Sequence, residues 1–93
     1  MGQLRKISPQ MLEVRFKGIA NHRRIQILIF IAEHDGATLE SIVSELACNL
    51  KTIAEHTKRL SDAQLIEKQP QGRHVMHYLS PSGRILYRFI RNF

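Results

Sequence analysis

The residues with the most evident chemistry in this sequence are the polar and charged side chains between positions 51 and 62. If the segment is a helix, about 100° per residue places them opposite or beside the apolar Ile53 side. They are Lys51, Thr52, Glu55, Lys58, Arg59 and Asp62. Lysine can donate to guanine O6 and N7, glutamate can accept from cytosine N4, and cations bind phosphates. This face therefore has the chemistry of a surface that contacts duplex nucleic acid.

The members of this face suit different contacts. Lys51 and Thr52 lie in the first turn, the part of a recognition helix that usually reaches base edges. Lys58 and Arg59 are better suited to phosphates. Glu55 can contact a cytosine or, in the interpretation we favour, pair with Arg59 four residues on, which is worth about 0.2–0.5 kcal/mol. For the whole face, the alternative is a solvated charged surface that contacts nothing.

The five histidines and the single cysteine do not match a metal or catalytic motif. His74 and His77 are three apart in a predicted strand, so they point to opposite faces and cannot share an ion. Cys48 is expected to be a small buried hydrophobe, with a redox switch as the alternative. No nucleophile, base and oxyanion donor are arranged as catalysis requires. We expect no enzyme activity, no cofactor and no metal, with a metal site shared between subunits as a minor alternative.

Charge indicates the class of partner. The 93 residues include 14 Lys and Arg against 8 Asp and Glu, a net charge of +6, which favours a polyanion. Residues 1–50 carry six basic and five acidic side chains, net +1, whereas residues 51–93 carry eight and three, net +5. With six aromatic residues and no Trp, the chain lacks the stacking residues of a single-strand binder. Double-stranded DNA is the expected partner.

Length and apolar patterning limit the architecture. Residues 1–93 are enough for one domain but not for two cores, and 43% hydrophobic residues indicate a folded chain. The longest apolar run covers only residues 27–32, against about 20 for a membrane span. The lone cysteine and the absence of a signal-peptide pattern favour the cytoplasm. We expect a single cytoplasmic domain with no membrane contact.

Cap residues and apolar spacing predict the elements that position these side chains. The predicted helices cover about 9–19, 22–34, 39–48, 50–63 and 82–93, and the predicted strands cover 66–69 and 74–79. The predicted caps are Ser8, Asn21, Thr38, Asn49 and Ser80. The second helix is apolar nearly all round and belongs at the centre, although its β-branched residues would also suit a buried strand. The third and fourth helices, joined by a very short turn, form a helix-turn-helix pair.

Several motifs occur in the order typical of one protein family. The first motif begins at residue 21 and reads Asn-His-Arg-Arg-Ile-Gln-Ile-Leu. The second is a helix over 38–46 that matches the pattern Thr-x-x-(Glu)-Leu. The third covers residues 49–65 and includes Thr52, Ile53, His56, Leu60 and Ala63. The hairpin follows, with Gly72 and Arg73 at its tip. From about residue 16 to residue 79 the chain resembles the ArsR-type winged-helix repressors of prokaryotes, and the 79–83 junction is similar to that of MarR-like regulators. The resemblance implies a mainly α fold with a small β-hairpin wing, the winged helix-turn-helix.

The chain also departs from that family. Metal-sensing members carry two cysteines before the turn, or Asp and His ligands in the last helix, whereas this chain has only Cys48 in the former place and none of these residues over 83–93. Gln64 replaces the usual Gly after the recognition helix, which leaves the geometry of that helix end open. The resemblance therefore implies a DNA-binding regulator without the two familiar metal sites.

Together these observations predict a homodimeric, sequence-specific regulator of transcription that binds double-stranded DNA. The expected DNA contacts are Thr38, Lys51, Thr52, Glu55, Lys58, Arg59, Arg73 and His74. For Arg73 the alternative is a solubilising loop residue. Apolar stripes on the first and last helices predict a dimer interface of Leu12, Phe16, Ile19, Leu86, Phe89, Ile90 and Phe93. We expect the recognition helix, wing and last helix to share one basic surface. The alternative function is a winged-helix protein-interaction module with a basic docking face and no DNA sequence specificity.

Overall fold

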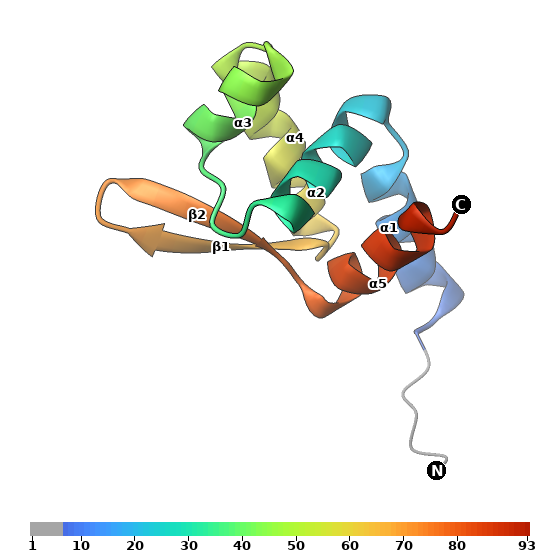
Figure 1. The fold of residues 1–93 in the computed structure, drawn as a ribbon. Coiled ribbons are helices and arrows are strands. Elements are labelled where there is room, and N and C mark those ends of the chain that lie inside the picture. The colour runs from blue at the N-terminus through green and yellow to red at the C-terminus, as the bar shows by residue number, and fades with distance from the viewer. Residues whose placement is uncertain (1–6) are drawn as a thin grey trace.

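The computed structural model describes residues 7–93, which form five helices and one two-stranded hairpin (Figure 1). In chain order they are α1 (Pro9–Ile19), α2 (His22–Glu33), α3 (Leu39–Leu46), α4 (Leu50–Asp62), β1 (Ile66–Gln71), β2 (His74–Leu79) and α5 (Pro81–Arg91). All the predicted elements are present. Three boundaries differ by two residues: α3 and α5 end two residues earlier than expected, and β1 continues two residues further, so that only Gly72 and Arg73 separate the strands.

All five predicted caps form, which explains why the helices begin where they do. In each case the side-chain oxygen accepts a backbone N–H of the first turn, and the residues are Ser8, Asn21, Thr38, Asn49 and Ser80. At α3 the cap is reciprocal, since Ser41 accepts from the Thr38 backbone N–H while Thr38 accepts from that of Ser41. The positions of the helices are therefore fixed largely by local chemistry.

The centre of the core is α2, as its apolar sequence predicts. Ile27, Leu28 and Ile31 are fully buried, and α2 packs against α1, α4, α5 and β2. From α4, Ile53 and Leu60 reach the same core. In Figure 1 α2 lies between α3 above and α5 below. The interpretation of residues 22–34 as a buried strand is wrong, because the cap and the length favour the helix.

Both helices of the helix-turn-helix pair are followed by a residue in the left-handed region. Ala47 has φ 51° at the end of α3, and Gln64 has φ 62° shortly after α4. Glycine adopts this conformation without steric cost, whereas other residues do so at some cost. Gln64 thus keeps the turn geometry that a glycine would supply. In the turn between α3 and α4, next to Ala47, Cys48 is half-buried against the core.

The hairpin is antiparallel, pairs Ile66 with Leu79 at its base, and extends away from the helices to the left in Figure 1. A further strand-like contact holds its base, where Gly36 and Ala37 exchange backbone hydrogen bonds with His77. The His77 side chain is buried, and its Nδ1 lies 2.8 Å from the carbonyl oxygen of Ala37. None of the described helices is long and apolar enough to cross a membrane.

Candidate nucleic-acid interface

The outer face of α4 has the composition that the sequence predicts. Ile53, Thr57 and Leu60 are 0%, 1% and 0% exposed, so the inward side of the helix is fixed. Five of the six predicted polar residues of the outer face are exposed, and Thr52 is half-buried beside them. Asn49 orients this first turn, because its side chain accepts the backbone N–H of Thr52 at 2.8 Å. The candidate reading edge of the helix is thus open to solvent.

The ion pairs on this face differ from the expected ones. The predicted pairing of Glu55 with Arg59 is wrong: within residues 7–93 the ion pair of α4 joins Lys58 Nζ to Asp62 Oδ2 at 3.0 Å. Both side chains are well exposed, so the pair is weak and can exchange for a phosphate contact. Four-residue spacing allows both pairings, which share no residue, and among residues 7–93 only the second is formed. Among the described residues, Glu55 makes no ion pair, and its exposed carboxylate lies in the middle of the face.

The remaining predicted DNA contacts lie at both ends of this surface. Thr38 is half-buried at the start of α3, where its side-chain oxygen caps the helix by accepting from Ser41 N at 3.2 Å. Arg73 and His74 are exposed at the far end of the hairpin. They belong to a different element from α4 and extend the polar surface well beyond it (Figure 1). A single ligand that contacts all these residues must be long.

The last helix does not share this surface, contrary to the expectation from charge. In Figure 1 α5 lies below α2, whereas α3 and the start of α4 lie above it. Its three arginines, Arg84, Arg88 and Arg91, are exposed. α5 packs against α2 and the base of β2. The positive charge of residues 51–93 is thus divided between two surfaces.

Sequence reasoning missed a basic cluster at the corner where α1 meets α2. Arg24 Nε donates to the carbonyl oxygen of Gly18 at 2.6 Å, and its Nη2 donates to that of Lys17 at 3.3 Å. Its Nη1 lies 3.4 Å from Nδ1 of His56 on α4. Arg59 lines the same pocket, of about 260 Å³, with Lys17, Arg24 and Asp62. No local motif signals this cluster, because its residues come together only when α1, α2 and α4 pack.

Burial and neighbouring charge affect the titration of this cluster. Burial lowers the pKa of Arg24, and the charge of Arg59 lowers it further. The pKa of His56 is lowered by burial and next by the charge of Arg24, while Glu55 opposes the shift. At the base of the wing, burial likewise lowers the pKa of His77 despite its hydrogen bond to Ala37. Both imidazoles therefore favour the neutral form.

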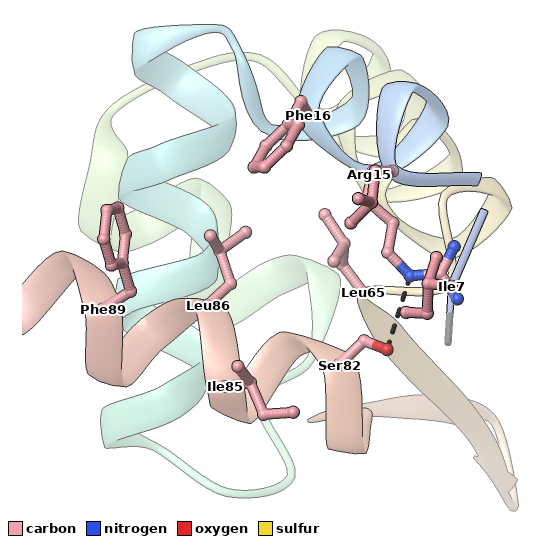
Figure 2. Close-up of a pocket in the computed structure, with 9 residues that line it drawn as sticks. Ile7, Arg15, Phe16, Leu65, Ser82, Ile85, Leu86 and Phe89 are labelled. Atoms are coloured by element: carbon pink, nitrogen blue, oxygen red, sulfur yellow. Dashed lines mark hydrogen bonds between the residues drawn. The ribbon is translucent and has the colours of Figure 1, made fainter. Parts of the chain in front are cut away.

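An apolar groove lies between α1 and α5 (Figure 2). Its volume is about 280 Å³, and Phe16, Leu86 and Phe89 point into or across it from the two helices. At one end Arg15 Nε donates to Ser82 Oγ at 3.4 Å. The aromatic rings remain largely uncovered: Phe16 is 57% exposed and Phe89 is 61% exposed.

The predicted interface residues do not all line the open surface. Leu12, Phe16, Phe89 and Phe93 are exposed. The prediction that Ile19 belongs to the dimer interface is wrong, because at 8% exposure it belongs to the core and is not available to a second chain. Leu86 and Ile90 are half-buried against the chain's own core and offer only their edges. The sequence interpretation omitted Ile85, although its spacing of four and eight residues from Phe89 and Phe93 marks the same stripe, and it is 65% exposed.

No protein-family model matches the sequence, and no curated protein matches it either. Solved structures, in contrast, do match this chain. HlyU from Vibrio cholerae N16961 superposes with a TM-score of 0.81 at 20% identity, covering 89% of this chain and 90% of that one. The homodimeric winged helix-turn-helix DNA-binding domain of Mb0332 from Mycobacterium bovis gives 0.77 at 24% identity, covering 89% and 74%.

This chain has the winged helix-turn-helix fold. FabT from Streptococcus pneumoniae, solved in complex with DNA, is a further example, with a TM-score of 0.74 at 17% identity over 90% of this chain and 65% of that one. In the winged helix-turn-helix, α4 occupies the place of the recognition helix and the β1–β2 hairpin is the wing. The fold class expected from the sequence is confirmed.

Proposed function

We propose that this protein is a sequence-specific regulator of transcription that binds double-stranded DNA, of the ArsR-like type. The observation that carries the proposal is the outer face of α4, which presents cations and hydrogen-bonding side chains on a helix whose apolar side is wholly buried. A helix of this kind fits the major groove, where base edges are distinguishable. The DNA-bound neighbour FabT and the M. bovis DNA-binding domain support the same role. Such a role belongs in the cytoplasm, with the DNA.

Within this proposal the predicted contacts divide by position. Lys51, Thr52 and Glu55 lie in the first half of α4 and read base edges. Lys58 and Arg59 hold phosphates, as does Thr38 at the start of α3 through its hydroxyl proton. At the tip of the wing, Arg73 and His74 contact the flanking backbone or minor groove. Phosphate contacts set affinity, and base contacts set specificity.

The second part of the proposal is a homodimer formed through α1 and α5. The groove between these helices is apolar, and its rim carries Phe16, Ile85 and Phe89, each more than half exposed. Apolar surface of this kind on a small protein normally marks an interface. A two-fold axis would place two copies of α4 in successive major grooves, about 34 Å apart on a near-palindromic site. The homodimeric state of the M. bovis neighbour supports this arrangement.

Selection of bound sequences from a random duplex pool tests the function. We expect enrichment of a near-palindromic motif, with an affinity that falls steeply as salt rises. Lys51→Ala should relax the preference for bases, whereas Arg59→Ala should weaken all sequences alike. Arg88→Ala is the matched control, because Arg88 is an exposed arginine on α5, away from α4. Absent or salt-independent binding would contradict the proposal.

One observation favours a second function. The arginines of α5 lie four and three residues apart along one side of the helix, and all three are exposed. They fit an acidic protein surface and are the basis for an interaction module that does not read DNA. The same selection experiment separates the two functions, because such a module enriches no motif. Its binding to acidic partners should be lost in Arg88→Ala and kept in Lys51→Ala.

A further inference from the structure

The corner formed by α1, α2 and α4 carries positive charge without a matching anion. Lys17 is paired with Glu13 at 2.8 Å, and Asp62 is paired with Lys58 at 3.0 Å. Within residues 7–93, neither Arg24 nor Arg59 makes an ion pair, although both line the same pocket of about 260 Å³. Two guanidinium groups that share a pocket repel each other unless an anion joins them. The pocket is lined by Lys17, Arg24 and Arg59 against the single carboxylate of Asp62, so its excess of positive charge favours a small oxyanion.

Arg24 is held rigidly at this corner. Two of its nitrogens donate to the carbonyl oxygens of Lys17 and Gly18, which are left without helical partners at the end of α1. These bonds fix the plane of the guanidinium and direct Nη1 toward His56. A group that is already oriented loses little conformational entropy when it binds a ligand. Arg24 is thus preorganised rather than a mobile surface cation.

The contact between Arg24 and His56 determines the protonation state of the imidazole. Guanidinium can only donate, so the His56 Nδ1 that lies 3.4 Å from Nη1 must accept, and the ring is neutral with its proton on Nε2. Protonation of Nδ1 would set two N–H groups against each other. That arrangement becomes favourable when an oxyanion beside the two groups accepts a hydrogen bond from each. The corner therefore binds a proton and an anion together more readily than either alone.

The location of the corner indicates the source of the anion. Arg59 lines a pocket with Val14, Lys17 and Gly18 of α1, and His56 contacts Arg24 of α2, whereas the wing extends away from the helices (Figure 1). A helix in the major groove has a phosphate backbone along each side. The wing can approach one backbone, and this corner can approach the other.

We propose that Arg24, His56 and Arg59 form a binding site for one backbone phosphate of the DNA, and that His56 takes up a proton as that phosphate binds. The proposal rests on the proposed function and adds to it a positioning contact and a source of pH dependence. The charged groups that act on His56 are Arg23 and Arg24 from α2 and Glu55 and Arg59 from α4, while Lys17 and Asp62 line the adjoining pocket with Arg24 and Arg59. Cations predominate, so proton uptake is unfavourable until the phosphate is present.

The linkage has a definite sign. In the free protein, burial and the neighbouring arginines keep the pKa of His56 below its ordinary value of 6.5. A bound phosphate raises that pKa, so the complex holds more protons than the free components between the two values. Affinity for DNA then rises as pH falls through this window. Each unit by which the pKa rises allows about a tenfold gain.

Fluorescence anisotropy with a labelled duplex and the full chain tests this, between pH 5.5 and pH 8 and at several salt concentrations. We expect the wild type to bind the duplex about tenfold more tightly at pH 5.5 than at pH 8. His56→Gln should lose most of this pH dependence, so that its affinity changes little between pH 5.5 and pH 8. Arg24→Gln should bind more weakly at every pH, with a salt slope reduced by about one. Thermal unfolding monitored by circular dichroism verifies that each variant is folded.

His34→Gln is the matched control, because His34 is an exposed histidine directly after α2, outside the corner and outside the predicted DNA contacts. It should keep the pH dependence of the wild type. If His56→Gln keeps that dependence as well, the proposal is overturned while the proposed function stands.

A second measurement separates the corner from DNA binding as such. Sulfate, a tetrahedral oxyanion that does not titrate in this range, is added to the free protein while the His56 ring is followed by NMR. We expect its pKa to rise with sulfate in the wild type and to stay unchanged in Arg59→Gln. If the wild type binds no duplex, the proposed function fails, and this titration still decides whether the corner binds an oxyanion. If sulfate leaves the pKa of His56 unchanged, the anion site is overturned.

Discussion

The helices α4 and α5 are of similar length, and each carries basic side chains on its outer side, yet they bury their apolar residues very differently. On α4 the apolar stripe is a single row, and Ile53 and Leu60 are fully covered. On α5 there are two rows. Leu86 and Ile90 pack against the chain's own core, whereas Ile85 and Phe89 lie beside the open groove.

This difference shows that amphipathic character alone does not reveal how a helix is used. A single buried row, as on α4, leaves mainly polar groups for a partner, which suits nucleic acid. A second apolar row, as on α5, exceeds what the core of a small domain can cover and suits another protein surface. The two cases are distinguished by whether the core covers every apolar row of the helix, as on α4, or leaves one row open, as on α5. Four substitutions test this comparison.

Leu60→Ala should have the largest effect on folding. Leu60 is fully buried on α4, and its truncation removes apolar contacts and leaves a cavity, at a cost of about 2–5 kcal/mol in the free energy of unfolding. Urea denaturation at fixed protein concentration measures the change. Leu50→Ala is the control, because Leu50 is on the same helix but 52% exposed, and it should cost less than about 1 kcal/mol. Equal losses in the two variants would show that α4 does not have a single buried row.

Phe89→Ser should have the opposite profile, with a large effect on association and a small one on the folded monomer. Its ring is more than half exposed beside the groove, and buried aromatic anchors at interfaces are worth about 2 kcal/mol or more. We expect the dimer dissociation constant to rise by more than about tenfold in analytical ultracentrifugation. Arg88 is an exposed neighbour on another side of α5, and Arg88→Ser should leave the dimer dissociation constant unchanged. An unaltered dimer in Phe89→Ser would remove the role assigned to the second row.

Ser80→Ala tests the junction where the end of α4 meets the start of α5. Ser80 Oγ donates to the carbonyl oxygen of Gln64 at 2.7 Å and accepts from Gly83 N at 2.9 Å, and the residue is buried. Its removal leaves both partners unsatisfied, and we expect a loss of about 1–2 kcal/mol in thermal unfolding. Ser8→Ala removes only the cap of α1 at an exposed hydrogen bond, so it should cost less. The reverse order would mean that the two helices are not coupled through Ser80.

The helices were predictable from the sequence because their caps and apolar spacing are local properties. Asn49 and Thr38 cap the helices they precede, and the buried side of α4 followed from Ile53 alone. What the sequence did not predict depends on packing between elements. Ile19 is covered by neighbouring segments, and Arg24 meets His56 from 32 positions away along the chain. The same holds for the position of α5, since charge counts along a chain do not say on which side of a core a helix packs.

Gln64→Gly addresses how the two helices end, and it should have the smallest effect, of the opposite sign. α4 is followed by Gln64 at φ 62°, whereas α5 ends at Asn92 with φ −95°, so only the former end has a left-handed residue. A residue with a Cβ atom is destabilised by about 1–2 kcal/mol in this conformation, and glycine avoids that strain. About half of the gain is lost, because glycine gives the unfolded chain a larger conformational entropy. The bond from Arg15 to the Gln64 side chain is exposed and contributes little.

The net expectation for Gln64→Gly is a stabilisation of about 0.5 kcal/mol, measured by urea denaturation. Ala47→Gly, at φ 51° after α3, should act in the same direction. Asn92→Gly should not stabilise, because its backbone already lies in a region that any residue adopts. A loss of stability in Gln64→Gly would contradict this expectation. It would mean that the hydrogen bond of the Gln64 side chain to Arg15, at the rim of the α1–α5 groove, stabilises the end of α4 by more than the backbone strain at Gln64 destabilises it. The recognition helix and the proposed dimer surface would then be coupled through a single residue.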